Sequence, residues 1–204
     1  SIAVTAGSTG NIAVDGVTRT GSAVIDNDLN NTEEIATSGD ITFLSGLSIF
    51  GSGTLTTGNA SLDGSSEGGV DKVTSGNISL TAGNGGVSGG IGLSAASSLI
   101  TGTATRIDPV PADADTTITA TSGSITLTSI DEINNGTAAT ALGISLGLAT
   151  ASTAPDVVNG NLDISTGPAG GAFITSASTL RVDDVNVGAG NLLLESDEIS
   201  FTGG

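Results

Sequence analysis

The sequence of 204 residues predicts an all-β protein, and within that class a parallel β-helix, or β-solenoid, formed by a single domain over residues 1–204. Three observations predict this fold. A short strand motif recurs along the chain, apolar and polar residues alternate within it, and the composition combines 32 glycines with only 2% aromatic residues. A narrow interior filled by Ile, Val, Leu and Ala suits such a composition, because large aromatic rings dominate the cores of most globular proteins.

The recurrent motif consists of a glycine, a small polar residue, and two apolar residues that flank a position of any type. Six copies occur: Gly10–Val14, Gly39–Phe43, Gly76–Leu80, Gly123–Leu127, Gly160–Ile164 and Gly190–Leu194. Ser1–Val4 looks like a seventh copy that lacks its glycine. The motif glycines lie at positions 10, 39, 76, 123, 160 and 190, so the intervals between successive glycines are 29, 37, 47, 37 and 30 residues. These intervals are typical of repeat architectures whose loops absorb insertions.

Each copy alternates apolar and polar residues with the period of two expected for a half-buried β-strand. Weaker alternating segments lie between the copies and are bounded by clusters of Gly, Asn, Asp and Ser, the residues that form turns. They are Leu47–Ile49, Ile91–Leu93, Ile144–Leu146, Leu180–Val182 and Ile199–Phe201. The Ala- and Leu-rich segment 138–151 contains two glycines within the same alternation, which favours a strand over a helix.

Two architectures fit many short strands with a recurrent first strand. In a repeated β-sandwich, antiparallel strands meet through hairpins, whereas in a parallel β-helix each strand pairs with its equivalent one coil later. Equivalent strands should look alike, so the recurrence favours the β-helix and leaves the sandwich as the alternative. At roughly 20–25 residues per coil we expect about eight to ten coils, a rod about 40 Å long. One interior ladder would then hold Ile12, Ile41, Ile78, Ile125, Leu162 and Leu192.

Three segments resemble the repeats of filamentous-haemagglutinin-type bacterial exoproteins: Ser75–Gly83, Thr121–Ser129 and Gly89–Ser94. The similarity extends loosely over the whole chain. It implies a long right-handed β-helix that acts as an adhesin or fibre at the bacterial cell surface. The family's N-terminal secretion domain, with its Asn-Pro-rich motifs, has no counterpart in this sequence, so the resemblance leaves the export route open.

The charge balance excludes several classes of partner. With 21 acidic against 4 basic residues, the net charge is −17, and a nucleic-acid binder needs a basic surface for the phosphate backbone. The same charge disfavours anionic membrane surfaces. The longest uncharged apolar stretch, 138–151, is too short to be inserted across a bilayer. We therefore expect no nucleic acid and no membrane insertion.

The residue types also argue against an enzyme. The chain has neither His nor Cys, so the two Gly-x-Ser-x-Gly segments, 64–68 and 143–147, lack the histidine base of a hydrolase. The acidic pairs Asp131-Glu132, Asp183-Asp184 and Asp197-Glu198 point to opposite faces of a strand rather than forming a carboxylate dyad. Few groups remain to hold an anionic sugar: Arg19, Lys72, Arg106 and Arg181. A polysaccharide-active β-helix enzyme is a minor alternative.

Calcium is the one ion that the sequence suggests, although no cofactor is required. Asp26, Asp28, Asn30 and Glu33 offer several oxygen ligands within one short segment, as Ca²⁺ prefers. A weaker group consists of Asp108, Asp113 and Asp115. The alternative is that both are solvated acidic loops that keep the chain soluble.

The leading hypothesis is a structural or adhesive segment of an extracellular bacterial fibre or large surface exoprotein, with an unknown surface ligand. The main alternative is a calcium-dependent, S-layer-like lattice protein. Ser1–Val4 begins inside a strand motif and Glu195–Gly204 finishes just after one. We therefore expect either a window of a longer repeat protein or a subunit that stacks end to end, because open solenoid ends expose strand edges.

Overall fold

The computed structural model describes residues 1–26, 33–63, 70–86, 88–107, 117–134, 140–151 and 156–202. Within these ranges the chain forms strands β1 to β24, joined by turns and short loops. Every pair of neighbouring strands is parallel, and the strands form five stacked sheets. The all-β class and the parallel pairing are thus confirmed, and the arrangement is consistent with a β-solenoid.

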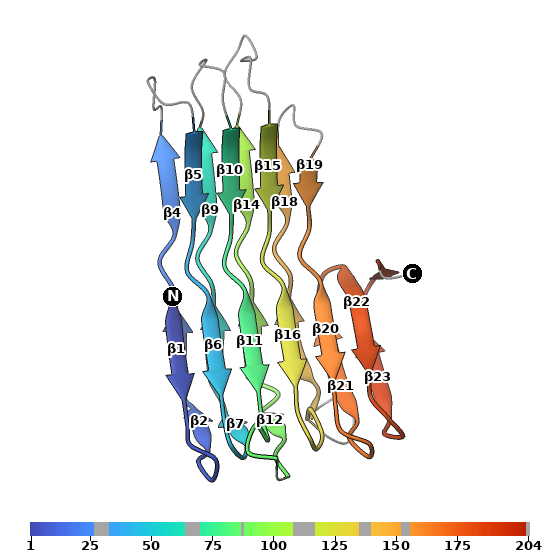
Figure 1. Cartoon of the computed structure of the whole chain (residues 1–204). Helices are drawn as coiled ribbons and strands as arrows, with labels where there is room; N and C mark the ends of the chain where they lie inside the picture. The colour runs from blue at the N-terminus through green and yellow to red at the C-terminus, as the bar shows by residue number, and fades with distance from the viewer. Residues whose placement is uncertain are drawn as a thin grey trace.

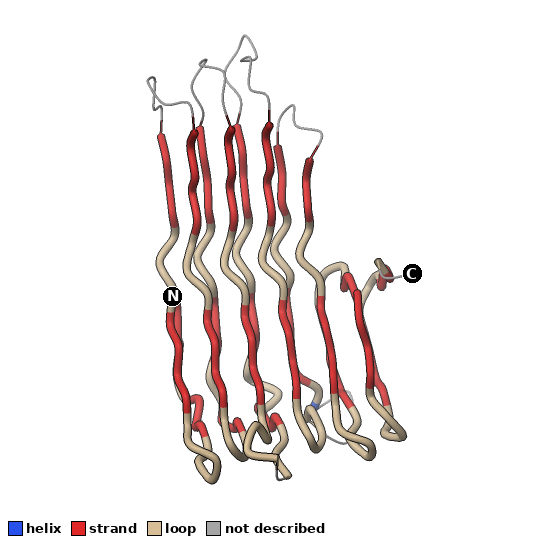
Figure 2. Tube along the Cα trace, viewed as in Figure 1, coloured by secondary structure: helices blue, strands red, loops and turns tan. Residues whose placement is uncertain are grey.

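The strands form two lobes separated by a band of loops, here called the waist (Figures 1 and 2). The first wall of the lower lobe is a seven-stranded sheet: β1 (Ile2–Thr5), β6 (Ile41–Leu44), β11 (Ile78–Thr81), β16 (Ile125–Thr128), β20 (Leu162–Ser165), β22 (Leu180–Asn186) and β24 (Ile199–Phe201). Its second wall has two sheets. One contains β2 (Ile12–Val14), β7 (Ile49–Gly51) and β12 (Ile91–Leu93). The other contains β3 (Val17–Arg19), β8 (Thr54–Thr56), β13 (Ser98–Ile100), β17 (Leu142–Ser145), β21 (Ala172–Ser176) and β23 (Leu192–Glu195).

The upper lobe consists of two four-stranded sheets. The first wall continues as β5 (Glu33–Thr37), β10 (Val70–Thr74), β15 (Thr117–Thr121) and β19 (Asp156–Val158). The second wall continues as β4 (Ala23–Asp26), β9 (Ala60–Asp63), β14 (Ala104–Ile107) and β18 (Ala149–Ala151). The lower lobe buries a core of Ile, Leu and Val, whereas the upper core is built mainly from alanines with Leu62 and Val73.

The repeat is longer than the sequence predicts. Along the first wall, register advances from Ile2 by 39 residues to Ile41, by 37 to Ile78, by 47 to Ile125, by 37 to Leu162, and by 20 to Val182. The expectation of eight to ten coils of 20–25 residues is therefore wrong. A long repeat traverses both lobes, while the repeats after β20 omit the upper lobe. Seven strands in the longest sheet make six steps, about 29 Å.

The single predicted ladder is in fact two. Ile41, Ile78, Ile125 and Leu162 align on the first wall. Ile12 aligns instead with Ile49 on the second wall, and Leu192 aligns there with Ala172. The motif marks the start of strands on both walls, so its recurrence in the sequence does not show to which wall a given copy belongs.

Each position of the motif has a structural role. A Cβ added to Gly76 would lie 2.0 Å from the carbonyl oxygen of Gly39 in the preceding repeat, so only glycine fits. The side chain of the polar residue bridges repeats: Asp40 Oδ1 accepts from the backbone N–H of Asn77 in the next repeat at 2.8 Å. The apolar residue, Ile78, is fully buried. Burial of one such side chain contributes about 1.5–3 kcal/mol.

The waist is crossed by a ladder of buried hydroxyls. Ser75 Oγ donates to the Gly102 carbonyl on the opposite wall at 2.6 Å, and it accepts from the Gly123 N–H of the next repeat at 2.8 Å. Five other hydroxyls make one or both of these bonds: Thr20, Ser38, Thr57, Thr101 and Ser122. The waist therefore joins wall to wall and repeat to repeat.

Arg181 terminates this ladder where the chain stops entering the upper lobe. Its Nε donates to the Gly160 carbonyl at 2.9 Å and its Nη2 to the Gly147 carbonyl at 2.7 Å. The side chain is buried, and this desolvation lowers the pKa of the guanidinium. These bonds satisfy carbonyls from both walls at the last long repeat.

We expect Ile78→Ala to reduce the free energy of unfolding by about 2–5 kcal/mol, because it leaves a cavity in the first-wall ladder. The matched control is Ile35→Ala, since Ile35 points outward and is 49% exposed; it should cost at most about 0.5 kcal/mol. Urea unfolding measures both. Equal losses for the two variants would contradict the assigned register.

Ser75→Ala should destabilise the chain by about 1–3 kcal/mol, because it removes a buried partner from the Gly102 carbonyl and the Gly123 N–H. Ser79→Ala is the control, since Ser79 lies on an outward, half-buried position of the neighbouring strand. Thermal unfolding and amide hydrogen exchange at Gly123 provide the measurements. Unchanged protection of Gly123 would show that the hydroxyl is dispensable.

Candidate functional site

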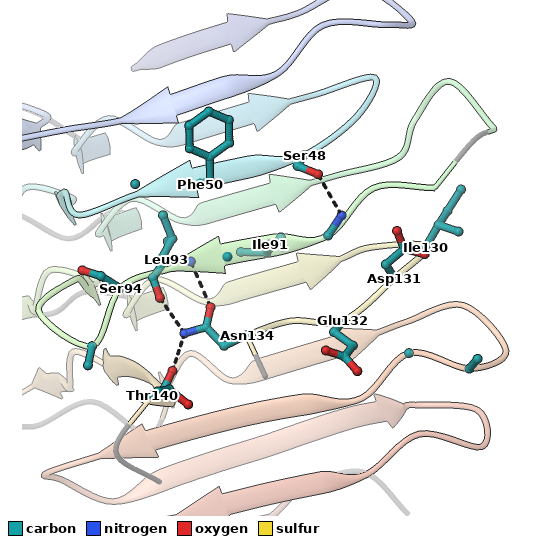
Figure 3. Close-up of a pocket in the computed structure, with 16 residues that line it drawn as sticks. Ser48, Phe50, Ile91, Leu93, Ser94, Ile130, Asp131, Glu132, Asn134 and Thr140 are labelled. Carbon is teal, nitrogen blue, oxygen red and sulfur yellow. Dashed lines mark hydrogen bonds between the residues drawn. The ribbon is translucent and has the colours of Figure 1, made fainter. Parts of the chain in front are cut away.

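An open groove of about 970 Å³ lies on the second wall of the lower lobe (Figure 3). It lies over β7 and β12 and the segment 130–134 that follows β16. Its lining is Ser48, Phe50, Gly51, Gly90, Ile91, Gly92, Leu93, Ser94, Ala95, Ile130, Asp131, Glu132, Asn134, Thr140, Ala169 and Gly170. Its size is within the usual range for small-molecule and short-peptide sites.

The floor of the groove is open because glycine faces outward from β12. Ile49 pairs with Ile91, and both are buried in the core, so the next residues, Phe50 and Gly92, point outward as register partners. A Cβ at Gly92 would meet no atom within 4 Å. Phe50 therefore borders an empty position and keeps 45% of its surface exposed.

The groove lies where the repeat is irregular. On the second wall, the repeat that follows β12 contributes a single bridge residue at this level instead of a strand. That residue is Ile133, which pairs with Ile91 on one side and Ala172 on the other. The following residue, Asn134, has a φ of 48°, in the left-handed region that favours Asn among non-glycine residues. Its side chain replaces the missing strand backbone: Oδ1 accepts from the Leu93 N–H at 3.0 Å, and Nδ2 donates to the Leu93 carbonyl at 2.6 Å.

The groove carries negative charge. Asp131 and Glu132 are exposed residues in its lining, and none of the described lining residues is Lys or Arg. The four basic residues that the sequence offers for an anionic sugar are dispersed. Arg106 and Arg181 are buried, while Arg19 and Lys72 are exposed outside the groove.

A buried ion pair occupies the core of the upper lobe. Arg106 Nη2 lies 2.5 Å from Asp71 Oδ2, with the side chains 0% and 7% exposed. Arg106 Nη1 also donates to the Ile107 carbonyl. Glu34, in register with Asp71, is buried too. Because the cluster is closed to solvent, it fits a role in specifying strand register rather than in binding. No local sequence pattern predicts this pairing, because its members are far apart in the chain.

The predicted calcium sites fall mostly outside the described residues. Asp28 and Asn30 lie outside them, as do Asp108, Asp113 and Asp115. Asp26 ends β4 and Glu33 begins β5. Among the residues that the structure describes, no group of three or more acidic, His or Cys side chains is arranged to hold a metal ion.

The other sequence candidates have varied locations. The Gly-x-Ser-x-Gly segment 64–68 is outside the described residues, and Ser145 of the second segment ends the regular strand β17. Of the acidic pairs, Asp131-Glu132 lines the groove and Asp197-Glu198 is exposed before β24. Asp183 and Asp184 lie in a β-bulge, opposite Asp163.

This bulge concentrates charge on the first wall. Two residues of β22 oppose one residue of β20, which brings Asp183 and Asp184 beside Asp163. Burial raises the pKa of the Asp163 carboxyl; a hydrogen bond from the Asp184 N–H opposes the rise, and the charges of Asp183 and Asp184 add to it.

Comparison with known proteins identifies no relative: no family model, no curated protein and no solved structure matches this chain. In the described ranges, none of the chain forms a helix long and apolar enough to traverse a membrane. Inference about function therefore depends on the fold and on the groove.

Asp163→Asn should change how stability depends on pH. Because the pKa of Asp163 is raised in the folded state, its protonated form favours folding, and this contribution is lost as pH rises from the ordinary value of 3.8 through the raised pKa. We expect the wild type to lose stability relative to Asp163→Asn over that window in urea unfolding at stepped pH. A stability difference that does not vary with pH, or varies with the opposite sign, would contradict this assignment.

Proposed function

We propose that this chain is a stiff structural or adhesive segment of an extracellular bacterial fibre or surface exoprotein, rather than an enzyme. In this proposal the two walls wind into a closed, right-handed β-helix. The observation that carries it is the continuous parallel pairing of the first wall from β1 to β24, with one β-bulge between β20 and β22. The resemblance of 75–83 and 121–129 to exoprotein repeats supports the extracellular location.

Stiffness follows from the density of bonds between repeats. Neighbouring repeats are joined by sheet hydrogen bonds on both walls and by polar bridges such as the Ser124 N–H to Asn77 Oδ1 at 2.8 Å, and the repeats that pass through both lobes are also joined by the hydroxyl ladder at the waist. In such quasi-one-dimensional folds each repeat contacts its neighbours alone, so bending must break several of these rows together.

The end strands provide the surface for self-association. Val4 belongs to the same inward row as Phe43 and Leu80, yet it is 41% exposed because β1 is outermost in its sheet. At the other edge Phe201 aligns with buried Val182 and is 70% exposed. Addition of a parallel strand would cover these side chains and pair the free edge.

Electrostatics sets the conditions for association. A charge of −17 per chain opposes close approach of two copies, and salt weakens that repulsion because the screening length is about 10 Å at 0.1 M and about 3 Å at 1 M. End-to-end pairing by strands needs no ion bridge, in contrast to a calcium-linked lattice.

Electron microscopy and sedimentation velocity at low and high NaCl, each with EDTA or CaCl₂, test this function. We expect elongated particles that lengthen at high salt and that EDTA does not disperse. Val4→Asp should reduce association, whereas Ile107→Asp should not, because Ile107 is exposed on the outward face of β14, a strand that is paired on both sides. Compact particles under every condition, or assembly that requires Ca²⁺, would overturn the proposal.

A further inference from the structure

We propose that the groove over β12 binds an extended peptide segment carrying a lysine side chain. This inference does not depend on the proposed structural role, because it concerns a lateral face and not the ends. Three features carry it: an exposed aromatic ring, a glycine floor, and two carboxylates in an otherwise uncharged lining.

Phe50 supplies the apolar contact. Its ring borders the groove above β12 in Figure 3, next to the vacant position at Gly92. An aromatic face next to open space suits the alkyl stem of a lysine, and it also attracts an ammonium group.

Asp131 and Glu132 supply the charge. They lie on the far side of β12 from Phe50, next to Ile133, which pairs with Ile91. Two strand spacings separate the Phe50 row from the Ile133 row, about 10 Å. A lysine side chain together with its own backbone spans that distance, so the stem crosses the glycine floor while the ammonium group reaches the carboxylates.

The charge pattern selects the sign of the ligand. The groove contains two of the carboxylates of a chain whose net charge is −17. In the part of its lining that the structure describes, it has no Lys or Arg that could pair with an anionic ligand. The overall field attracts cations to every face. Specificity must therefore come from the combination of ring, floor and carboxylates that the groove provides.

The peptide-facing polar groups are held in place. Asn134 fixes the edge of the groove through its bonds to Leu93 and through Nδ2, which donates to the Thr140 carbonyl at 2.8 Å. The backbone around Ile133 bonds to both neighbouring rows. On one side the Ile133 N–H donates to the Gly171 carbonyl and the Ile133 carbonyl accepts from the Phe173 N–H; on the other side the Glu132 carbonyl accepts from the Ile91 N–H. These hydrogen bonds hold in place the backbone that carries the carboxylates of Asp131 and Glu132.

Titration calorimetry or NMR of the full chain with tri-lysine at 50 mM NaCl tests the inference. We expect saturable binding that shifts amide signals of 90–94 and 131–134. Phe50→Ala should weaken it about two- to fivefold, and Asp131→Asn/Glu132→Gln about five- to tenfold. The tri-peptide of Nε-acetyl-lysine, of similar shape without the side-chain charges, should not bind measurably.

The matched control is Asp197→Asn/Glu198→Gln, which makes the same pair of substitutions and the same charge change at an exposed site outside the groove. It should leave tri-lysine binding within twofold of wild type. Equal weakening by the two double variants would show that net charge alone attracts the peptide, and would overturn the site. Binding of acetylated peptide or of a neutral trisaccharide with equal affinity would overturn the lysine assignment. Circular dichroism confirms that each variant remains folded.

Discussion

The contact between glycine backbones at the waist is the constraint on which the whole stack depends. Gly76, Gly123 and Gly160 each lie so close to the glycine of the preceding repeat that an added Cβ would approach its carbonyl oxygen to about 2 Å. The same holds on the opposite wall at Gly58, Gly102 and Gly147. These contacts let the walls bend toward each other, and they place each glycine N–H and C=O within reach of a buried hydroxyl. The motif glycine is therefore a requirement of packing between repeats rather than of a turn within one.

The waist also divides the interior into two cores with different chemistry. The lower core holds branched aliphatic ladders, which supply most of the buried apolar area. The upper core is filled largely by alanines, which fit a narrower space and specify register weakly. An ion pair such as Asp71 with Arg106 compensates for that weakness, since a misaligned strand would leave a buried charge without its partner.

The positions of individual strands could be predicted from the sequence, whereas the route of the chain through the two walls and the two lobes could not. The motif copies at Ile41, Ile78, Ile125 and Leu162 predicted strands correctly, because alternation is a local property. The repeat length was underestimated because nothing local shows that the chain passes through a second lobe before it returns. For the same reason Ile12 was assigned to the first-wall ladder. The wall to which a strand belongs depends on the length of the loops that connect successive strands, which the motif does not reveal. The groove left a faint signal in Gly90 and Gly92, where glycine interrupts the apolar–polar alternation. The single bridge residue Ile133 and the role of Asn134 as a substitute for backbone emerge only from the register.

Regularity and irregularity have separate uses in this chain. The first wall repeats the same side-chain bonds in successive rows up to β20, as at Ser38, Ser75 and Ser122, and this repetition gives the stack its continuity. Departures occur on the second wall at Ile133, where a strand is reduced to one bridge and the groove opens, and on the first wall at Arg181 of β22, where a guanidinium replaces the hydroxyl ladder as the upper lobe ends. Each departure is accommodated by a polar side chain that takes over the bonds of the missing element. Because a repeat contacts only its neighbours, such a local exchange leaves the remaining rows intact. A local surface can therefore be built into one row of stacked parallel strands without disruption of the other rows.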